Sequence, residues 1–377
     1  MINMKIFTAF RRIVYIGLLV AALWYLNSLK ANPATAEEWT RGYVRMIVQY
    51  PIMASAYVPI SITEIAAVLI AIVLLILVVQ FLVNLFKGRG VKAINKLLLA
   101  GVFVLVPVTL YFFSCQLAYN REDIPLPFHQ DPVASSEFVD IYNYYADDIN
   151  NIIANDLEFE ANGEIKSDFD LATLTDEVIA AHSIADDDYY HPFVGNVKGM
   201  LSSPLFTELQ ITGLAFAPFG EANINTLNTK IGLPLTIAHE LAHTRGVMRE
   251  DDASQLAFYV CLNSDSPYLR YSAYAATFYQ LEVMVSETYI SAAERENLHP
   301  IDTTFNLSRN YVNSYWAEHD LLGDIGDKIN DLYIKSSGIE DGTDSYNGGT
   351  QIETDPVTLE LVPSLYQKLY FEKYYRV

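Results

Sequence analysis

The sequence predicts three transmembrane helices followed by a mostly α-helical extracytoplasmic domain of α+β type with a small sheet. Three observations predict this fold class. The first third of the chain contains three long apolar runs, apolar residues recur at helical spacing from residue 135 onward, and one segment near residue 213 has the composition of a strand. We therefore expect a membrane domain at residues 1–119 and a second domain at residues 120–377.

The three apolar runs are each about 20 residues long, which is the length that a helix needs to cross a bilayer. They cover residues 13–29, 65–86 and 97–119, and Pro107 is expected to kink the third. The first run is interpreted as a retained anchor, because residues 24–27 do not form the small-residue cleavage site of a signal peptide.

Charge is distributed unevenly along the chain, which has a net charge of −21. Residues 1–119 contain ten Lys or Arg and three acidic residues, which leaves 14 basic and 42 acidic residues in the remainder. Because an acidic domain repels phosphates, nucleic acid is not an expected partner. The basic residues lie before the first span and between the second and third. The positive-inside rule therefore predicts a multi-pass protein of the cytoplasmic membrane, with its N-terminus inside and its C-terminal domain outside.

The functional prediction depends on His-Glu-Leu-Ala-His at residues 239–243. On a helix, His239 and His243 project from one face, since they are four residues apart. Two imidazoles placed in this way can bind one Zn²⁺, and Glu240 between them can act as general base on the metal-bound water. Pro234 suits the first turn of such a helix.

A catalytic zinc site needs a third protein ligand, and two acidic residues after the motif can supply it. Gly246 can end the motif helix in a left-handed conformation and turn the chain back, and a second helix is expected from about residue 250. Glu250 is the favoured ligand. Asp252 is the alternative, although its side chain is shorter and its path longer. Acidic residues at a helix start also have a structural explanation, because they interact favourably with the helix dipole.

The segment HELAHTRGVMREDDASQLAFYVC at residues 239–261 resembles an uncharacterised bacterial family of membrane proteins. That family has several N-terminal spans and a zincin-like ectodomain, with a signature of HELAH, a Gly, and an Arg-Glu-Asp-acid-Ala run. Residues 213–225 resemble the same family through Gly-Glu-Ala-Asn. The resemblance implies a zincin-type metallopeptidase by motif only.

Residues 250–254 are also similar to the Glu-x-x-Ala-Asp motif of gluzincin metallopeptidases. In those enzymes the Glu is the third zinc ligand and the Asp orients another ligand. Ser254 stands here in place of that Asp, so the resemblance leaves the orienting role open.

Further residues are candidate contacts to a substrate. Leu214 to Ala217 are expected to form a strand edge that binds an extended peptide as an additional strand. Three side chains are possible contacts to the substrate or to the oxyanion of the tetrahedral intermediate, since metallopeptidases often use a Tyr or His for the latter. They are Glu221, His319 and Tyr346.

These features together predict a membrane-anchored zinc metallopeptidase whose partners are a peptide or protein substrate and the lipid bilayer. Its cofactor would be Zn²⁺, which lowers the pKa of its bound water, while Glu240 transfers the proton to the leaving amine. One alternative is a non-catalytic, zinc-stabilised ectodomain that acts as an envelope sensor or scaffold. The intact Glu240 argues against it, because a structural site needs no base. The other alternative is a zinc hydrolase acting on a non-peptide bond.

Overall fold

The computed structural model describes the chain except for residues 1, 167–169, 337–351, 356–357, 359 and 377. Three of its helices are long and apolar enough to cross a membrane: α1 (Ile2–Leu29), α4 (Ile62–Phe86) and α5 (Gly90–Ser114). The three expected spans are thus present as helices. The third starts earlier than predicted, because residues 90–96, which include Lys92, Asn95 and Lys96, belong to the same helix. It also ends earlier, and a 3₁₀ helix, η2 (Gln116–Asn120), follows it.

Three short helices connect the first and second spans: α2 (Pro33–Trp39), the π-helical η1 (Thr40–Val44) and α3 (Arg45–Ser55). They do not form a separate loop, because they pack on the second domain. Asn196 donates hydrogen bonds of 2.7 Å to the Ile52 carbonyl and to the Ser55 hydroxyl. The side chain of Ile52 also occupies the space beside Gly220, where no Cβ would fit. The connection therefore belongs structurally to both parts of the chain.

The second domain is mostly helical, as predicted. Its α-helices are α6 (Phe138–Asn155), α7 (Leu171–Ala181), α8 (Ser203–Glu208), α9 (Leu233–Thr244), α10 (Glu250–Leu262), α11 (Pro267–Thr277), α12 (Tyr279–Met284), α13 (Ala292–Arg295), α14 (Thr303–Glu318), α15 (Gly323–Ser336) and α16 (Leu365–Arg376). Short 3₁₀ helices are η3 (Ser135–Glu137), η4 (His182–Ile184) and η5 (Ala217–Phe219).

The core of this domain surrounds α9 and α10, which are buried along most of their length. Helix α6 contributes the apolar face that its spacing predicted. Aromatic side chains fill the space between α6, α10, α11 and α16, and the largest of these are fully buried: Tyr145, Phe258, Tyr274 and Tyr370. The core therefore holds α9 and α10 in a fixed relation.

The main sheet has three short strands, β1 (Asn196–Gly199), β2 (Gly213–Phe216) and β3 (Glu221–Ile224), in the order β1-β3-β2. β1 pairs parallel to β3, and β2 pairs antiparallel to it. The predicted strand is β2, which ends one residue early because Pro218 lies in the 3₁₀ helix that follows. A second sheet consists of β4 (Glu353–Thr354) and β5 (Leu361–Val362).

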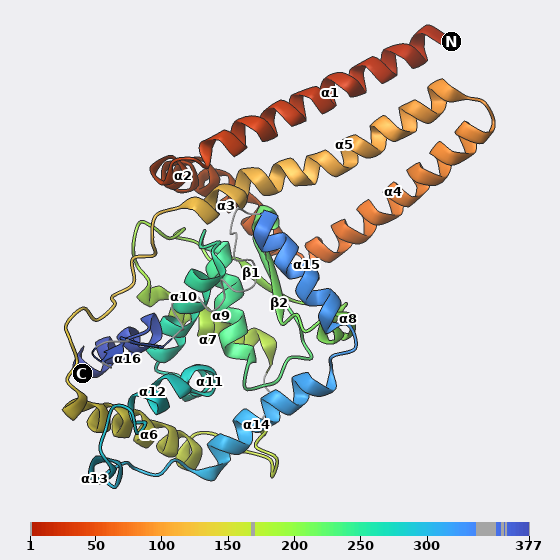
Figure 1. The fold of residues 1–377 in the computed structure, drawn as a ribbon. Coiled ribbons are helices and arrows are strands. Elements are labelled where there is room, and N and C mark those ends of the chain that lie inside the picture. Colours follow the sequence, from red (N-terminus) through yellow and green to blue (C-terminus); the bar gives the residue numbers. More distant parts are fainter. Residues whose placement is uncertain (1, 167–169, 337–351, 356–357, 359, 377) are drawn as a thin grey trace.

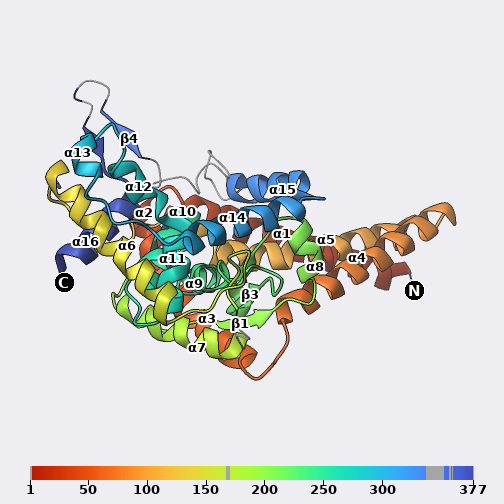
Figure 2. The same cartoon turned by 90° about the horizontal axis from the view of Figure 1, so that it is seen from below.

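Figures 1 and 2 show the three spans projecting from one side of the helical domain. The N-terminal end of α1 and the turn between α4 and α5 lie together at the far end of this bundle (Figure 1). At its base, the spans meet α2, α3 and the sheet. The sheet therefore lies between the membrane helices and the rest of the domain.

Candidate metal centre

The two histidines of the motif occupy one face of α9, as their spacing predicted. Pro234 lies in the first turn of this helix. The Nε2 atoms of His239 and His243 lie 3.1 Å apart, and both point toward the helix that follows. His243 is buried, whereas His239 remains partly accessible.

Gly246 turns the chain from α9 into α10. Its φ is +87°, the left-handed conformation that the sequence suggested. Because of this turn, Glu250 at the start of α10 returns to the histidines. Its Oε2 lies 3.1 Å from Nε2 of His239 and 3.4 Å from Nε2 of His243. One ligand atom from each of the three residues thus lies within 4.8 Å of the others.

Asp252 points elsewhere. Its carboxylate accepts a hydrogen bond of 2.6 Å from Nε of Arg249, which also pairs with Asp123 at 3.1 Å. Of the two acidic candidates, the structure therefore brings Glu250, and not Asp252, to the imidazoles.

Both imidazoles are oriented through their second nitrogen. Nδ1 of His243 donates to the carbonyl of Val247 at 2.7 Å, and Nδ1 of His239 lies 3.2 Å from the hydroxyl of Ser254. Ser254 also forms a hydrogen bond with Tyr366. With Nδ1 of each ring engaged in this way, the Nε2 atoms face each other and Glu250. Two imidazoles and one carboxylate are a donor set that suits catalytic Zn²⁺, and fixed ring orientation strengthens such a site.

Electrostatics favour a positive charge between the three ligands. Burial raises the pKa of Glu250, but the charge of His243 and hydrogen bonds from both histidines outweigh it and hold this pKa far below its ordinary value. Burial lowers the pKa of His243, but Glu250 outweighs it and raises the pKa to about 9. The carboxylate of Glu250 thus favours a positive charge on the imidazole side of the cluster, as a bound cation would supply.

Glu240 lies beside the ligands and faces strand β2. Burial raises its pKa, against the opposing effect of the two imidazoles and of the Ala215 amide. A Cβ at Gly213 would lie 2.6 Å from Oε1 of Glu240, so only glycine leaves room for the carboxylate here. A carboxylate with a raised pKa next to a metal site can accept and return a proton.

Strand β2 forms the edge of the described three-stranded sheet. The amide of Asn225 donates to the carbonyl of Thr212 across the β2–β3 pair. Hydrogen-bonded and non-bonded pairs alternate in antiparallel ladders, so Gly213 and Ala215 direct their backbone groups away from β3. The predicted strand edge thus borders the metal site.

A cavity of about 800 Å³ opens beside the metal site. Its lining includes His239, Glu240, His243 and Glu250, together with Gly213, Leu214 and Ala215 of β2. Helices α11, α12, α14, α15 and α16 complete it, and they contribute the aromatic side chains of Tyr279 (α12), Trp316 (α14) and Tyr366 (α16). Sequence reasoning singled out none of these three, because no spacing rule distinguishes them among 26 tyrosines and three tryptophans.

The three remaining candidates lie outside this cavity or outside the described residues. Glu221 is fully buried in β3, where it accepts hydrogen bonds from the first residues of α4. His319 stacks on Tyr315, and its Nδ1 lies 2.8 Å from the Tyr315 carbonyl. Tyr346 falls outside the described residues.

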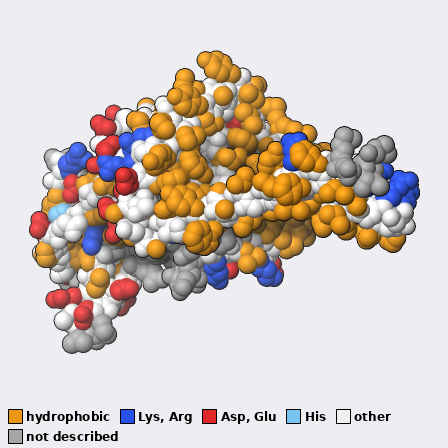
Figure 3. Space-filling model, turned by 90° about the horizontal axis from the view of Figure 1, so that it is seen from above, with side chains coloured by type: hydrophobic (Ala, Val, Ile, Leu, Met, Phe, Trp, Pro, Cys, Tyr) orange, Lys and Arg blue, Asp and Glu red, His pale blue; other side chains and the backbone are white. Residues whose placement is uncertain are grey.

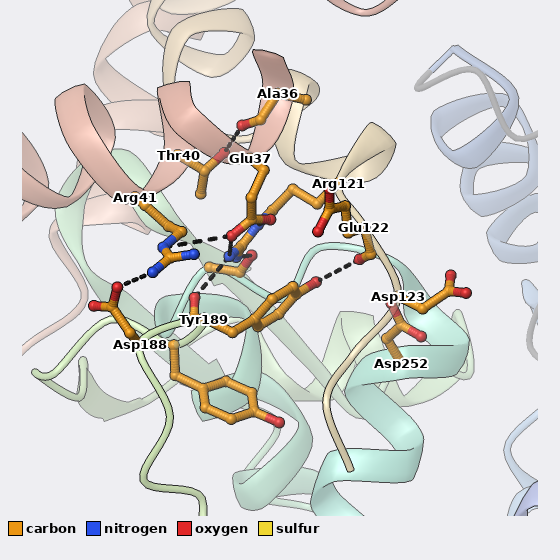
Figure 4. Close-up of polar contacts among 12 residues, drawn as sticks. Ala36, Glu37, Thr40, Arg41, Arg121, Glu122, Asp123, Asp188, Tyr189 and Asp252 are labelled. Carbon is orange, nitrogen blue, oxygen red and sulfur yellow. Dashed lines mark hydrogen bonds and ion pairs between the residues drawn. The ribbon is translucent and has the colours of Figure 1, made fainter. Parts of the chain in front are cut away.

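A buried ion pair connects the candidate metal centre to helix α2, which follows the first candidate span. Figure 4 shows Arg121 facing Glu37 of α2, and two hydrogen bonds of 2.8 Å join them. Arg121 also donates to the carbonyls of Gly246 and Tyr189. Because Gly246 forms the turn between His243 and Glu250, this network fixes the turn that assembles the three ligands.

Comparison with known proteins gives one match. A family described as "Protein of unknown function (DUF3810)" matches residues 39–351. No curated protein and no solved structure matches the chain. The match starts at the last residue of α2 and extends through the sheet, the candidate metal centre and α15, so it includes most of the connection between the first two spans. The chain, with its three candidate membrane spans and its helical second domain, therefore belongs to the DUF3810 family.

Proposed function

We propose that this protein is a zinc-dependent metallopeptidase anchored in the cytoplasmic membrane. The observation that carries the proposal is the convergence of His239, His243 and Glu250 at the wall of an open cavity, with Glu240 beside them. A structural zinc site is closed by four protein ligands, whereas a catalytic site has three and keeps one position open.

Each residue has a defined task in this proposal. His239, His243 and Glu250 would hold the ion, and Ser254 and the Val247 carbonyl would keep the two imidazoles in the ligating orientation. Bound zinc supplies a Lewis acid that polarises a carbonyl and makes water more acidic. Glu240 takes the proton from the attacking water and gives it to the leaving amine.

Strand β2 supports a peptide as the substrate. The backbone groups of Gly213 and Ala215 point away from β3 toward the cavity side; the Ala215 amide contacts Glu240, and an extended peptide can pair with the remaining groups. Main-chain pairing of this kind recognises a polypeptide independently of its sequence. It also places a scissile bond next to Glu240, which the Ala215 amide contacts.

Charge supports the orientation that the proposal needs. The basic residues before the first span and those around the turn between α4 and α5 lie at the same end of the helical bundle (Figure 1). With this end in the cytoplasm, the metal centre lies outside the membrane.

The test uses the full chain, purified in detergent. Zinc content is measured by elemental analysis, and cleavage is measured with a mixed-sequence peptide library. We expect His243→Ala and Glu250→Gln to lose zinc, and Glu240→Gln to keep zinc but lose cleavage. Asp252→Asn is the matched control and should keep zinc. A wild-type chain without zinc contradicts the proposal. Cleavage that survives in Glu240→Gln contradicts its mechanism and points to a structural site.

A further inference from the structure

The connection between the first two spans presents an uncharged outer face. On one side, Val44, Val48 and Ile52 are buried against the second domain. On the other side, large apolar and aromatic side chains are exposed, with Tyr57 at 88%. These are Tyr43, Met46, Ile47, Tyr50, Met53 and Tyr57, which we call the outer face. The sequence has no charged residue from Met46 to Thr63.

The outer face lies in the connection between two candidate spans. α1 ends at Leu29 and α4 begins at Ile62, so the connecting helices lie at the level where the spans leave the bilayer. Figure 3 shows hydrophobic side chains over the spans, and acidic side chains toward the opposite end of the molecule. Six large apolar or aromatic side chains exposed together are unfavourable in water, and tyrosines are enriched where a membrane protein meets the lipid headgroups.

A second apolar feature is fixed at the same level. The carboxylate of Glu64, in the first turn of α4, accepts hydrogen bonds of 2.9 Å from the amides of Leu201 and Ser202. Leu201, just before α8, is 79% exposed, and Leu205 within α8 is also exposed. α8 therefore begins where α4 enters the membrane.

The metal centre lies close to this level. Phe206 of α8 and Leu209 just after it line the cavity. Met248, from the turn between His243 and Glu250, also lines it and belongs to one apolar cluster with Cys115, which caps α5, and Tyr119 of η2. Met248 thus belongs both to the wall of the cavity and to the apolar cluster that follows the third candidate span.

We propose that the outer face and the side chains of Leu201 and Leu205 lie in the bilayer interface, and that the metal site acts on polypeptides held at that surface. The substrate class is a membrane-anchored polypeptide cleaved near its anchor. The inferred location at the bilayer depends only on the exposed apolar side chains, whereas the substrate class rests on the proposed metallopeptidase function.

The location is tested by fluorescence quenching, which needs no enzymatic activity. The full chain is reconstituted in vesicles of phosphatidylethanolamine and phosphatidylglycerol that carry a nitroxide near the headgroup. Met53→Cys and Leu201→Cys receive an NBD label; both native cysteines are buried. Leu307→Cys on α14, 43% exposed, is the control. We expect quenching of the labels at positions 53 and 201, but not at 307. Equal quenching at all three positions overturns the location.

The substrate class is tested with one mixed-sequence peptide library in two forms, free and attached to a palmitoyl anchor in the same vesicles. We expect the anchored form to be cleaved at least about tenfold faster, because the anchor raises its local concentration at the surface. Cuts should lie within about ten residues of the anchor, a reach of roughly 35 Å in extended chain. Equal cleavage of both forms overturns the substrate class and leaves the metallopeptidase intact. If zinc is bound and neither form is cleaved, the proposed function fails, and the substrate class fails with it.

Discussion

Glu221 gives the sharpest test of how the two parts of the chain are joined. Its two carboxylate oxygens accept hydrogen bonds of 3.0 Å from the Ile62 amide, and of 2.9 and 2.8 Å from the amide and hydroxyl of Thr63. These amides belong to the first turn of α4, whose N–H groups have no partner within the helix. A carboxylate at this end also interacts favourably with the helix dipole. Glu221 of β3 therefore caps a candidate membrane span.

The magnitude follows from these contacts. Glu221→Ala removes three hydrogen bonds to a charged acceptor, each contributing about 1.5–3 kcal/mol, and leaves buried donors unpaired. The donors regain some hydration in the cavity that the substitution creates, so we expect a net loss of about 3–5 kcal/mol. A domain of this size loses about 2–4 °C in Tm per kcal/mol, which corresponds to a fall of at least about 6 °C.

The assay is a thermal unfolding curve of the full chain in detergent, with zinc content and peptide cleavage measured below the transition. Glu160→Gln is the control, since Glu160 is exposed and substitutions at such sites change stability by less than about 0.5 kcal/mol. Suppose instead that Glu221→Ala keeps its Tm within about 2 °C and selectively loses cleavage. Glu221 would then contact the substrate, and the capping argument would be refuted.

Three further outcomes are expected. Gly213→Ala should keep zinc but reduce cleavage about 10–100-fold, because its Cβ displaces the Glu240 carboxylate; wild-type turnover would contradict this. Gly246→Ala should lower the stability by about 1–2 kcal/mol, since its φ of +87° is unfavourable for alanine, whereas Gly42→Ala, with open space around it, should be neutral in thermal unfolding. Burial lowers the pKa of His182 to about 3. Below pH 6.5 the unfolded chain therefore binds a proton that the folded chain does not. The free energy of unfolding then decreases as the pH is lowered, by about 2 kcal/mol at pH 5. His182→Gln should show a shallower fall of Tm between pH 7.5 and 5, and parallel curves for the two proteins would refute this.

Local patterns in the sequence predicted the elements whose partners lie nearby in the chain. The spans, α6 and the motif helix follow from apolar length or periodicity, which a helix imposes on residues three and four apart. The approach of Glu250 to the histidines was also predictable. It needs only one turn at a glycine, and all three residues lie within a segment of 12 residues.

Contacts between distant segments were not predictable from one sequence. Glu221 follows the strand β2 in the chain, and the sequence suggested a substrate contact; its hydrogen bonds, however, go to residues about 160 positions earlier. The roles of Tyr366 and Trp316 in the cavity wall likewise depend on how α14 and α16 pack, and no local pattern encodes that packing. Ser254 is an intermediate case. Its position in the motif marked it, but only the fold shows its hydroxyl beside His239.

Contacts between distant segments also cross the domain boundary that the sequence predicted at residues 119–120. Arg121 is 3% exposed because Glu37 covers and neutralises it, and Lys198 is buried with its ammonium group on the carbonyls of Ser55 and Val58. Removal of residues 1–119 would expose or orphan these charges and the carboxylate of Glu221. Leaving one partner of a buried ion pair uncompensated costs about 3–5 kcal/mol, a large part of the stability of a typical domain. The spans and their connecting helices therefore complete the fold of the second domain, and its candidate metal centre has to be studied in the full chain.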